Sequence, residues 1–253
     1  MHHHISTRLQ GLTLLLLVEI GLSFAFADDN INDGLVQNAV ENEIVATPLL
    51  ARNPGSILSP ADSLVERLQL ITSLQARFNQ SLSSNTEHIQ TGEFWLQKPN
   101  KFRVESGAPL SQTIVSDGLN LWTFDRDLDQ VIISLLDVGA AEIPLLLFAG
   151  NPEAVVESFT VEGFAGENFS RYVLEPIQSD SLITSVTLTF ENNSPTSLVI
   201  YDSLRERIQI VLSEVIVGGI NVGDENVGEN KADDIFFFEI PESVDVIDDR
   251  PVN

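Results

Sequence analysis

The chain has 253 residues, and 43% of them are hydrophobic. This is enough for one sizeable hydrophobic core but too little for two large independent domains. Acidic residues outnumber basic ones by 37 to 13, and the net charge of −24 makes nucleic acid a poor partner. The same charge fits a protein that touches anionic membranes only briefly, and it fits adaptation to a saline habitat equally well. No cysteine is present, so disulfides, thiolate metal sites and lipid attachment to the chain itself are excluded.

The first 27 residues have the form of a secretory signal peptide. Arg8 precedes an apolar run from Leu12 to Phe26, and the run ends Ala25-Phe26-Ala27, a small-x-small site for cleavage before Asp28. Glu19 is a charge within this run, and a transmembrane anchor is the alternative interpretation. The apolar run is shorter than the roughly 20 residues that span hydrocarbon. We therefore expect export to the periplasm with cleavage near Ala27.

Residues 28–57 are acidic, rich in Asn and without sustained periodicity, which predicts a flexible leader. The folded domain is expected over residues 58–250. It opens with a helix-start pattern: Ser59 as the cap, Pro60 in the first turn and an acid at Asp62. Apolar residues then recur at helical spacing from Leu64 to Phe78, so the sequence predicts a helix that ends near Gln80.

After this helix the hydrophobic period changes to two, which predicts about eleven strands between turn residues. The expected strands are Gly92–Lys98, Lys101–Glu105, Gln112–Val115, Asn120–Phe124, Gln130–Leu135, Ser158–Phe164, Arg171–Glu175, Ile183–Phe190, Ser197–Tyr201, Arg207–Val217 and Ile235–Ile240. Tight turns, such as Lys98-Pro99-Asn100, force antiparallel neighbours. The segment Asp137–Val156 is predicted to be helical and interrupts the strands. The fold class is mainly β: a large antiparallel sheet that curls around helical segments as an incomplete barrel.

Residues that carry catalysis are not apparent. Without the signal peptide one histidine is left, His88, in a polar segment with no nucleophile motif near it. Zinc would need more His or Cys ligands than the chain has, and the acidic residues near Asp224 lack the spacing of a calcium loop. We therefore expect no enzyme activity, no metal and no cofactor.

Several motifs, taken in order, resemble the LolA family of outer-membrane lipoprotein carriers. The strongest is Gly92-Glu93-Phe94-Trp95-Leu96-Gln97-Lys98-Pro99-Asn100-Lys101-Phe102-Arg103-Val104-Glu105. It is followed by Ile114-Val115-Ser116-Asp117-Gly118, Leu121-Trp122-Thr123-Phe124-Asp125, Ile143-Pro144-Leu145-Leu146-Leu147-Phe148-Ala149-Gly150-Asn151 and Phe236-Phe237-Phe238-Glu239-Ile240-Pro241-Glu242. The resemblance spans about Ser59 to Arg250 and leaves out the leader and the acidic residues near Asp224.

The resemblance implies an incomplete antiparallel barrel closed by a helical lid, whose concave face holds the acyl chains of lipoproteins. It implies a monomeric periplasmic carrier that uses no cofactor, receives cargo from the inner-membrane ABC transporter LolCDE and passes it to the outer-membrane receptor LolB. A sensor or adaptor on the same half-barrel, or a carrier of other lipids, is the alternative. Deletion of the leader would test the sensor or adaptor alternative. The identity of the co-purifying lipid would test whether the chain carries other lipids.

The expected acyl-chain site combines strand and lid residues. Alternation places Phe94, Leu96, Phe102 and Val104 on one face of the sheet, and the family match adds Leu145, Leu146 and Phe148 from the lid. Plain core packing is the other interpretation of the lid residues. Lys98 shares the parity of the strand residues and stands where this family commonly has an arginine that holds the lid shut. We predict a weaker latch, because lysine lacks the planar fork of arginine; a lysine that reaches water at the rim is the alternative.

Overall fold

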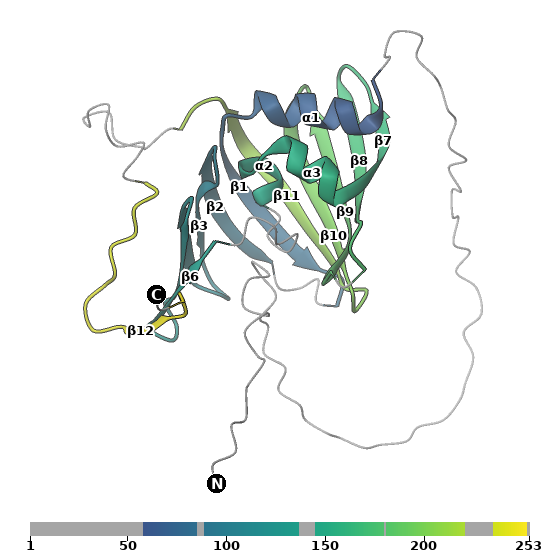
Figure 1. The fold of residues 1–253 in the computed structure, drawn as a ribbon. Helices are drawn as coiled ribbons and strands as arrows, with labels where there is room; N and C mark the ends of the chain where they lie inside the picture. The colour runs from purple at the N-terminus through teal and green to yellow at the C-terminus, as the bar shows by residue number, and fades with distance from the viewer. Residues whose placement is uncertain (1–57, 85–88, 137–144, 180, 221–234, 252–253) are drawn as a thin grey trace, which may run out of the picture. The chain divides into compact units, whose positions relative to one another are not determined.

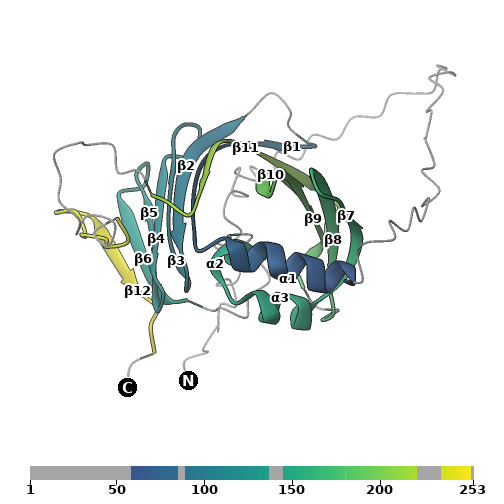
Figure 2. The ribbon, with the colours of Figure 1, turned by 90° about the horizontal axis from the view of Figure 1, so that it is seen from above.

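The computed structural model describes residues 58–84, 89–136, 145–179, 181–220 and 235–251. The predicted signal peptide, the predicted leader, His88, the acidic residues near Asp224 and the first part of the predicted lid therefore lie outside the described residues. Twelve strands form one sheet in the order β12-β6-β5-β4-β3-β2-β1-β11-β10-β9-β8-β7. The sheet curves strongly, and three helices lie across its concave side (Figures 1 and 2). The mainly β fold class is confirmed.

Eleven of the twelve strands pair with antiparallel neighbours, and β12 pairs with β6 in parallel. The strands are β1 (Ser73–Leu82), β2 (Gln90–Gln97), β3 (Lys101–Ser106), β4 (Gln112–Asp117), β5 (Asn120–Asp125), β6 (Gln130–Leu135), β7 (Phe159–Ala165), β8 (Phe169–Pro176), β9 (Ile183–Glu191), β10 (Ser194–Asp202), β11 (Arg207–Val217) and β12 (Asp245–Asp248).

Helix α1 (Pro60–Leu70) begins as its sequence predicts. The side chain of Ser59 accepts a hydrogen bond from the backbone N–H of Asp62 at 3.1 Å, and Pro60 occupies the first turn. Its end is a correction, because the helix stops at Leu70 and β1 starts at Ser73. Residues four apart share a face in a helix and also in a strand, so Leu74 and Phe78 fit both patterns. Pairing of β1 with both β2 and β11 decides for the strand.

Two further helices follow β6. Helix α2 (Leu146–Ala149) and helix α3 (Pro152–Ser158) confirm the helical character of the described part of the segment Asp137–Val156. Asn151 caps α3 by accepting a hydrogen bond from the backbone N–H of Glu153 at 3.2 Å. Helix α1 contacts β7 and α3, whereas α2 contacts β2 and α3. The helices thus span the open side of the curved sheet from β7 to β2.

The predicted tight turns are present. Asn100, Asn192 and Asn193 have positive φ of 59°, 48° and 66°, a backbone region in which Asn is favoured among residues with a side chain. They lie in the β2–β3 and β9–β10 turns, so that each hairpin reverses within a few residues. Asp117 closes the β4–β5 turn by accepting hydrogen bonds from the backbone N–H groups of Leu119 and Asn120.

The C-terminal segment differs from its prediction. Ile235–Ile240 is not a strand but an irregular segment that packs on the outer face of β5, where the Phe238 ring lies 6.4 Å from Trp122 and 6.2 Å from Phe124. Phe236 is 2% exposed and Phe237 is 68% exposed. The side chains of this segment therefore alternate between buried and exposed as in a strand, but the segment packs on one side only and forms no ladder hydrogen bonds. Strand β12, which the sequence did not predict, follows and covers the edge of β6.

Candidate functional site: the concave face and its helical cover

The concave face of β2 and β3 is built from cross-strand apolar pairs. Phe94 pairs with Val104 and Leu96 with Phe102, so the four residues share one face as the alternation predicts. All four are buried, with exposed fractions of 4% or less. Gly92 lies on the same face, opposite Phe78, where a Cβ atom would come within 2.6 Å of the Phe78 ring and 2.2 Å of the Glu105 carbonyl oxygen. A side chain at position 92 would therefore clash with the Phe78 ring and with the backbone of β3.

Helix α2 covers this face with apolar side chains. Leu146, Leu147 and Phe148 are 7%, 6% and 1% exposed, and Phe148 packs edge-on against Phe190 of β9 with ring centroids 6.4 Å apart. Leu145 precedes the helix and is partly exposed. The structure thus places Leu146 and Phe148 among buried residues inside the curved sheet, with Leu145 at the margin.

Helix α2, the described part of the predicted lid, is attached to the sheet through backbone atoms. The N–H of Asn100, in the β2–β3 turn, donates to the carbonyl oxygen of Ala149 at 2.9 Å. A Cβ on Gly150 would come within 2.6 Å of the Leu146 carbonyl oxygen, so a glycine is needed where α2 ends. Because Asn100 follows Lys98 and Pro99, the turn that the sequence singles out is also the attachment point of α2.

Lys98 is partly buried at the edge of the helical cover. Its Nζ donates to the carbonyl oxygen of Leu68, near the end of α1, at 2.5 Å, and its backbone N–H donates to Thr72 O at 2.9 Å. Burial lowers the pKa of Lys98, and the nearby carboxylate of Glu153 on α3 acts in the opposite direction. Lys98 therefore bonds to α1, not to α2, and a role in holding the cover closed would act through α1.

Sequence reasoning missed Arg67, which lies near the end of α1. Its Nε donates to Tyr172 Oη at 3.0 Å, Nη1 to Asn193 Oδ1 at 2.6 Å and Nη2 to the Gly166 carbonyl oxygen at 2.7 Å. The guanidinium carbon also lies 5.9 Å from the centroid of the Phe190 ring. The acceptors are about a hundred residues away in the chain, and only a basic residue in the last turn of a helix marks the position in the sequence.

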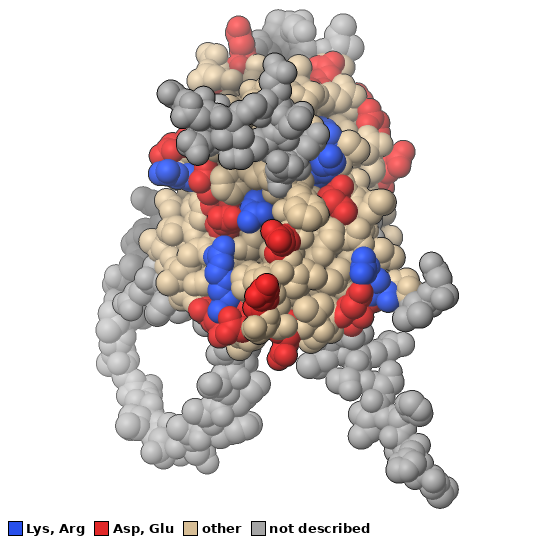
Figure 3. All heavy atoms as spheres, turned by 90° about the vertical axis from the view of Figure 1, so that its left-hand side faces the viewer, with Lys and Arg blue, Asp and Glu red and all other residues tan. Residues whose placement is uncertain are grey.

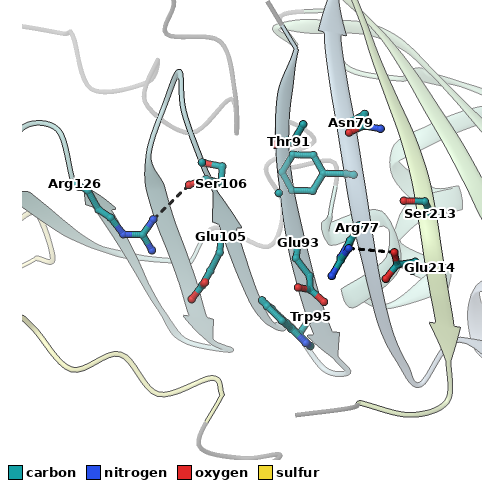
Figure 4. A pocket seen from close by; sticks show the side chains of 13 residues that line it. Arg77, Asn79, Thr91, Glu93, Trp95, Glu105, Ser106, Arg126, Ser213 and Glu214 are labelled. Atoms are coloured by element: carbon teal, nitrogen blue, oxygen red, sulfur yellow. Dashed lines mark hydrogen bonds and ion pairs between the residues drawn. The ribbon is translucent and has the colours of Figure 1, made fainter. Parts of the chain in front are cut away.

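A polar groove of about 560 Å³ lies on the opposite, outer face of β1, β2, β3 and β11 (Figure 4). Arg77 pairs with Glu214 at 3.2 Å and Gln75 donates to Glu93 at 2.9 Å. The buried indole Nε1 of Trp95 has no partner among the described residues. Acidic and basic side chains lie close together over the surface in Figure 3. A groove with this lining does not suit an apolar ligand.

Metal-binding and membrane-spanning features are not found in the described part of the chain. No cluster of three or more His, Cys, Asp or Glu residues there could hold a metal ion. None of the helices in the described ranges combines the length and the apolar character that crossing a bilayer demands.

Comparison with known proteins decides the family. A family model described as outer membrane lipoprotein carrier protein LolA matches residues 69–218. An outer-membrane lipoprotein carrier protein of Chromohalobacter salexigens is 35% identical over 190 residues, which are 74% of this chain and 86% of that protein. The chain belongs to the LolA family. The matched range begins within α1 and ends just after β11, so it contains Lys98, α2 and α3 and leaves out β12.

Other relatives agree with this assignment. The outer-membrane lipoprotein carrier protein of Pseudomonas syringae pv. tomato is 30% identical over 216 residues, which are 84% of this chain and 98% of that protein. Among solved structures, a LolA superfamily protein from Nitrosomonas europaea matches 65% of this chain and 96% of its own, with a TM-score of 0.38 and 13% identity. The membership in the LolA family accordingly rests on the sequence comparisons.

Proposed function

We propose that this chain carries lipoproteins through the periplasm and binds their acyl chains on the concave face of the sheet, beneath the helices. The curated relatives are named outer-membrane lipoprotein carrier proteins, which supports cargo of this class. The observation that carries the site is the composition of the cover: α2 consists of Leu146, Leu147, Phe148 and Ala149, all buried against an apolar sheet face. In this proposal Phe94, Leu96, Phe102, Val104, Leu145, Leu146 and Phe148 line the acyl-chain site.

The energetics of such a site fit a carrier that must release its cargo. Burial of an acyl chain is worth about 0.8 kcal/mol per CH₂, so three chains would bind too tightly if the site stood open. Here Leu96, Phe102 and Phe148 are already covered, with exposed fractions of 0%, 0% and 1%. An acyl chain must displace the lid from this surface, and the apolar area that the lid loses is subtracted from the affinity.

Lys98 is proposed to stabilise the closed state. Its bond to Leu68 O ties the end of α1 to the β2–β3 turn, from which Asn100 also holds α2. Loss of this tie would make the closed state less competitive with bound acyl chains. The lysine offers a single hydrogen bond here, so the latch is weak by comparison with a planar guanidinium fork.

The wider pathway is proposed from the family. The signal peptide would direct the chain to the periplasm, where cleavage near Ala27 would leave residues 28–57 as a leader. The carrier would take cargo from the inner-membrane transporter LolCDE and deliver it to the outer-membrane receptor LolB. No cofactor is needed for this transfer, because the driving force is burial of apolar surface.

The test is purification of the mature chain from periplasm, followed by mass spectrometry for bound triacylated lipoprotein. Wild type is expected to carry substoichiometric lipoprotein, and Lys98→Leu is expected to retain several-fold more. Lys101→Leu is the matched control, because it makes the same change three residues away on the first residue of β3. Empty protein in all three preparations would contradict the carrier proposal, and equal loading of all three would contradict the role of Lys98.

A further inference from the structure

Helix α1 is fixed to the sheet by polar contacts. The Arg67 guanidinium donates to a side chain of β8, to one of the β9–β10 turn and to a backbone carbonyl of the β7–β8 turn. Ser63 Oγ lies 2.9 Å from Tyr172 Oη, which adds a second contact between α1 and β8. Hydrogen bonds from a charged donor are roughly twice as strong as neutral ones, and the planar guanidinium holds its acceptors in fixed directions.

Helix α2 is held in a different way. Its four residues, Leu146 to Ala149, carry no polar side-chain atom, so α2 itself is held by apolar packing and by the backbone bond from Asn100 to Ala149. The nearby polar contact from Gln69 Nε2 to Glu153 Oε1, at 2.8 Å, joins α1 to α3 and not to α2. An acyl chain that enters the site offers the sheet the same kind of apolar contact that Leu147 and Phe148 give up. It offers nothing that replaces the hydrogen bonds of Arg67.

We propose that the site opens by outward movement of α2 while α1 stays docked, and that Arg67 is the positioning residue that keeps α1 in place. This inference rests on the proposed function and says which part of the cover yields to cargo. Arg67 would then hold one fixed wall of the acyl-chain site, against Phe190, with Phe148 on the wall that moves. Lys98 links the fixed part to the part that moves: its bond to Leu68 O holds the β2–β3 turn against α1, and Asn100 of that turn holds α2 in the closed state.

The chain contains no cysteine, so single thiols can report the opening of each helix. Leu64 of α1 and Leu147 of α2 are 0% and 6% exposed, and Leu64→Cys and Leu147→Cys make the same chemical change on the two helices. Thiol labelling of the ligand-free mature protein under native conditions measures local opening. We expect Leu147→Cys to react at least about tenfold faster than Leu64→Cys, since one neutral hydrogen bond is weaker than the Arg67 network by more than that factor.

Arg67→Met separates positioning from general stability. It should raise the labelling rate of Leu64→Cys by roughly tenfold or more and leave that of Leu147→Cys within about threefold, because the lost hydrogen bonds belong to α1. Arg67→Lys keeps the charge but lacks the planar guanidinium group. The labelling rate of Leu64→Cys in this background should lie between the rates measured with Arg67 and with Arg67→Met. Arg77→Met is the matched control, since Arg77 pairs with Glu214 on the outer face and should alter neither rate. Leu68→Cys and Leu146→Cys, 0% and 7% exposed, form a second pair if either first variant does not fold.

Equal rates for the two helices in wild type, or equal acceleration of both by Arg67→Met, would overturn the proposal. A second arm adds a synthetic tripalmitoylated cysteinyl peptide, which should speed the labelling of Leu147→Cys and leave Leu64→Cys protected. If the wild type does not bind this lipopeptide, the proposed function fails, while the ligand-free rates still decide how the cover opens.

Discussion

The sheet has two apolar surfaces, and they are covered in different ways. On the concave face, α2 contributes apolar side chains and one backbone hydrogen bond from Asn100. On the outer face of β5, the C-terminal segment contributes the ring of Phe238, with Phe236 buried two residues earlier, and continues into β12, which pairs along β6. Arg103 Nη1 donates to Ile235 O at 3.4 Å, and Arg250 Nη1 donates to Asn120 Oδ1 at 3.2 Å.

This difference indicates which cover is permanent. A strand that pairs in a ladder exchanges several hydrogen bonds with its neighbour and shields a sheet edge that would otherwise be free to aggregate. An apolar helix without polar side chains can be replaced by an apolar ligand at little cost. We therefore propose that the outer cover serves stability and the inner cover serves binding, and substitutions in the two covers should separate these properties.

The largest effect is expected in the outer cover. Phe236→Ala should lower the free energy of unfolding by about 3–5 kcal/mol, because it removes a fully buried ring, and should leave lipopeptide affinity unchanged. Phe237→Ala is the control: its ring is 68% exposed, so its effect should stay within about 0.5 kcal/mol. Urea unfolding and lipopeptide titration measure both quantities. A Phe236→Ala protein of unaltered stability would contradict the assignment of a permanent cover.

The same change in the inner cover should act on both properties. Phe148→Ala should cost about 3 kcal/mol of stability, the lower end for a buried ring, because the short helix α2 can settle into part of the space. It should also tighten lipopeptide binding several-fold, since the closed state competes less well for the concave face. Weaker binding by this variant would show that Phe148 contributes more as a wall of the site than as a competitor.

Much of the fold was predictable because the period-two pattern is strong. Ten of the eleven predicted strands are present, and Phe94, Leu96, Phe102 and Val104 share a buried face as predicted. The helix predicted up to Gln80 was wrong because Leu74 and Phe78 fit either period, and pairing with β2 and β11 is a long-range effect. Strand β12 escaped prediction because it has only four residues, Asp-Val-Ile-Asp, and pairs in parallel with β6, which lies more than a hundred residues earlier in the chain.

The candidate site was predictable only in part. Apolar strand and lid residues follow from pattern and family resemblance, whereas the Arg67 contacts join α1 to residues about a hundred positions away. A local pattern contains no information on such acceptors. For Lys98, the sequence indicated a cation at the edge of the cover, and only the structure shows that its acceptor is Leu68 O of α1.

The two covers also differ in the groups that titrate. Lys98 lies in the β2–β3 turn at the edge of the inner cover, and burial lowers its pKa below the usual 10.5. Between that lowered pKa and 10.5 the unfolded chain binds more protons than the folded one, so stability from this group rises with pH. Urea unfolding between pH 7 and pH 11 should show that the free energy of unfolding of wild type increases relative to that of Lys98→Met as the pH rises. The opposite trend would mean that the charged form is favoured by its bond to Leu68 O.

The smallest effect is expected from the exposed ion pair at the end of the outer cover. Arg250 Nη2 donates to Asp248 Oδ2 at 2.6 Å. The hydrogen bonds that the side chain and the backbone of Arg250 donate lower the pKa of Asp248 from 3.8 to about 2. A depressed carboxyl pKa means that the stabilisation is present above pH 3.8 and is lost as pH falls through about 2.

Asp248→Asn should remove this acid-dependent loss while changing the midpoint of thermal unfolding little at pH 7, because an exposed pair contributes little to stability. Thermal unfolding between pH 2 and pH 5 at low and high salt measures the effect, which salt should screen. A large, salt-independent change at pH 7 would show that the pair fixes β12 to β6. The permanence of the outer cover would then depend on this pair as well as on the buried ring of Phe236.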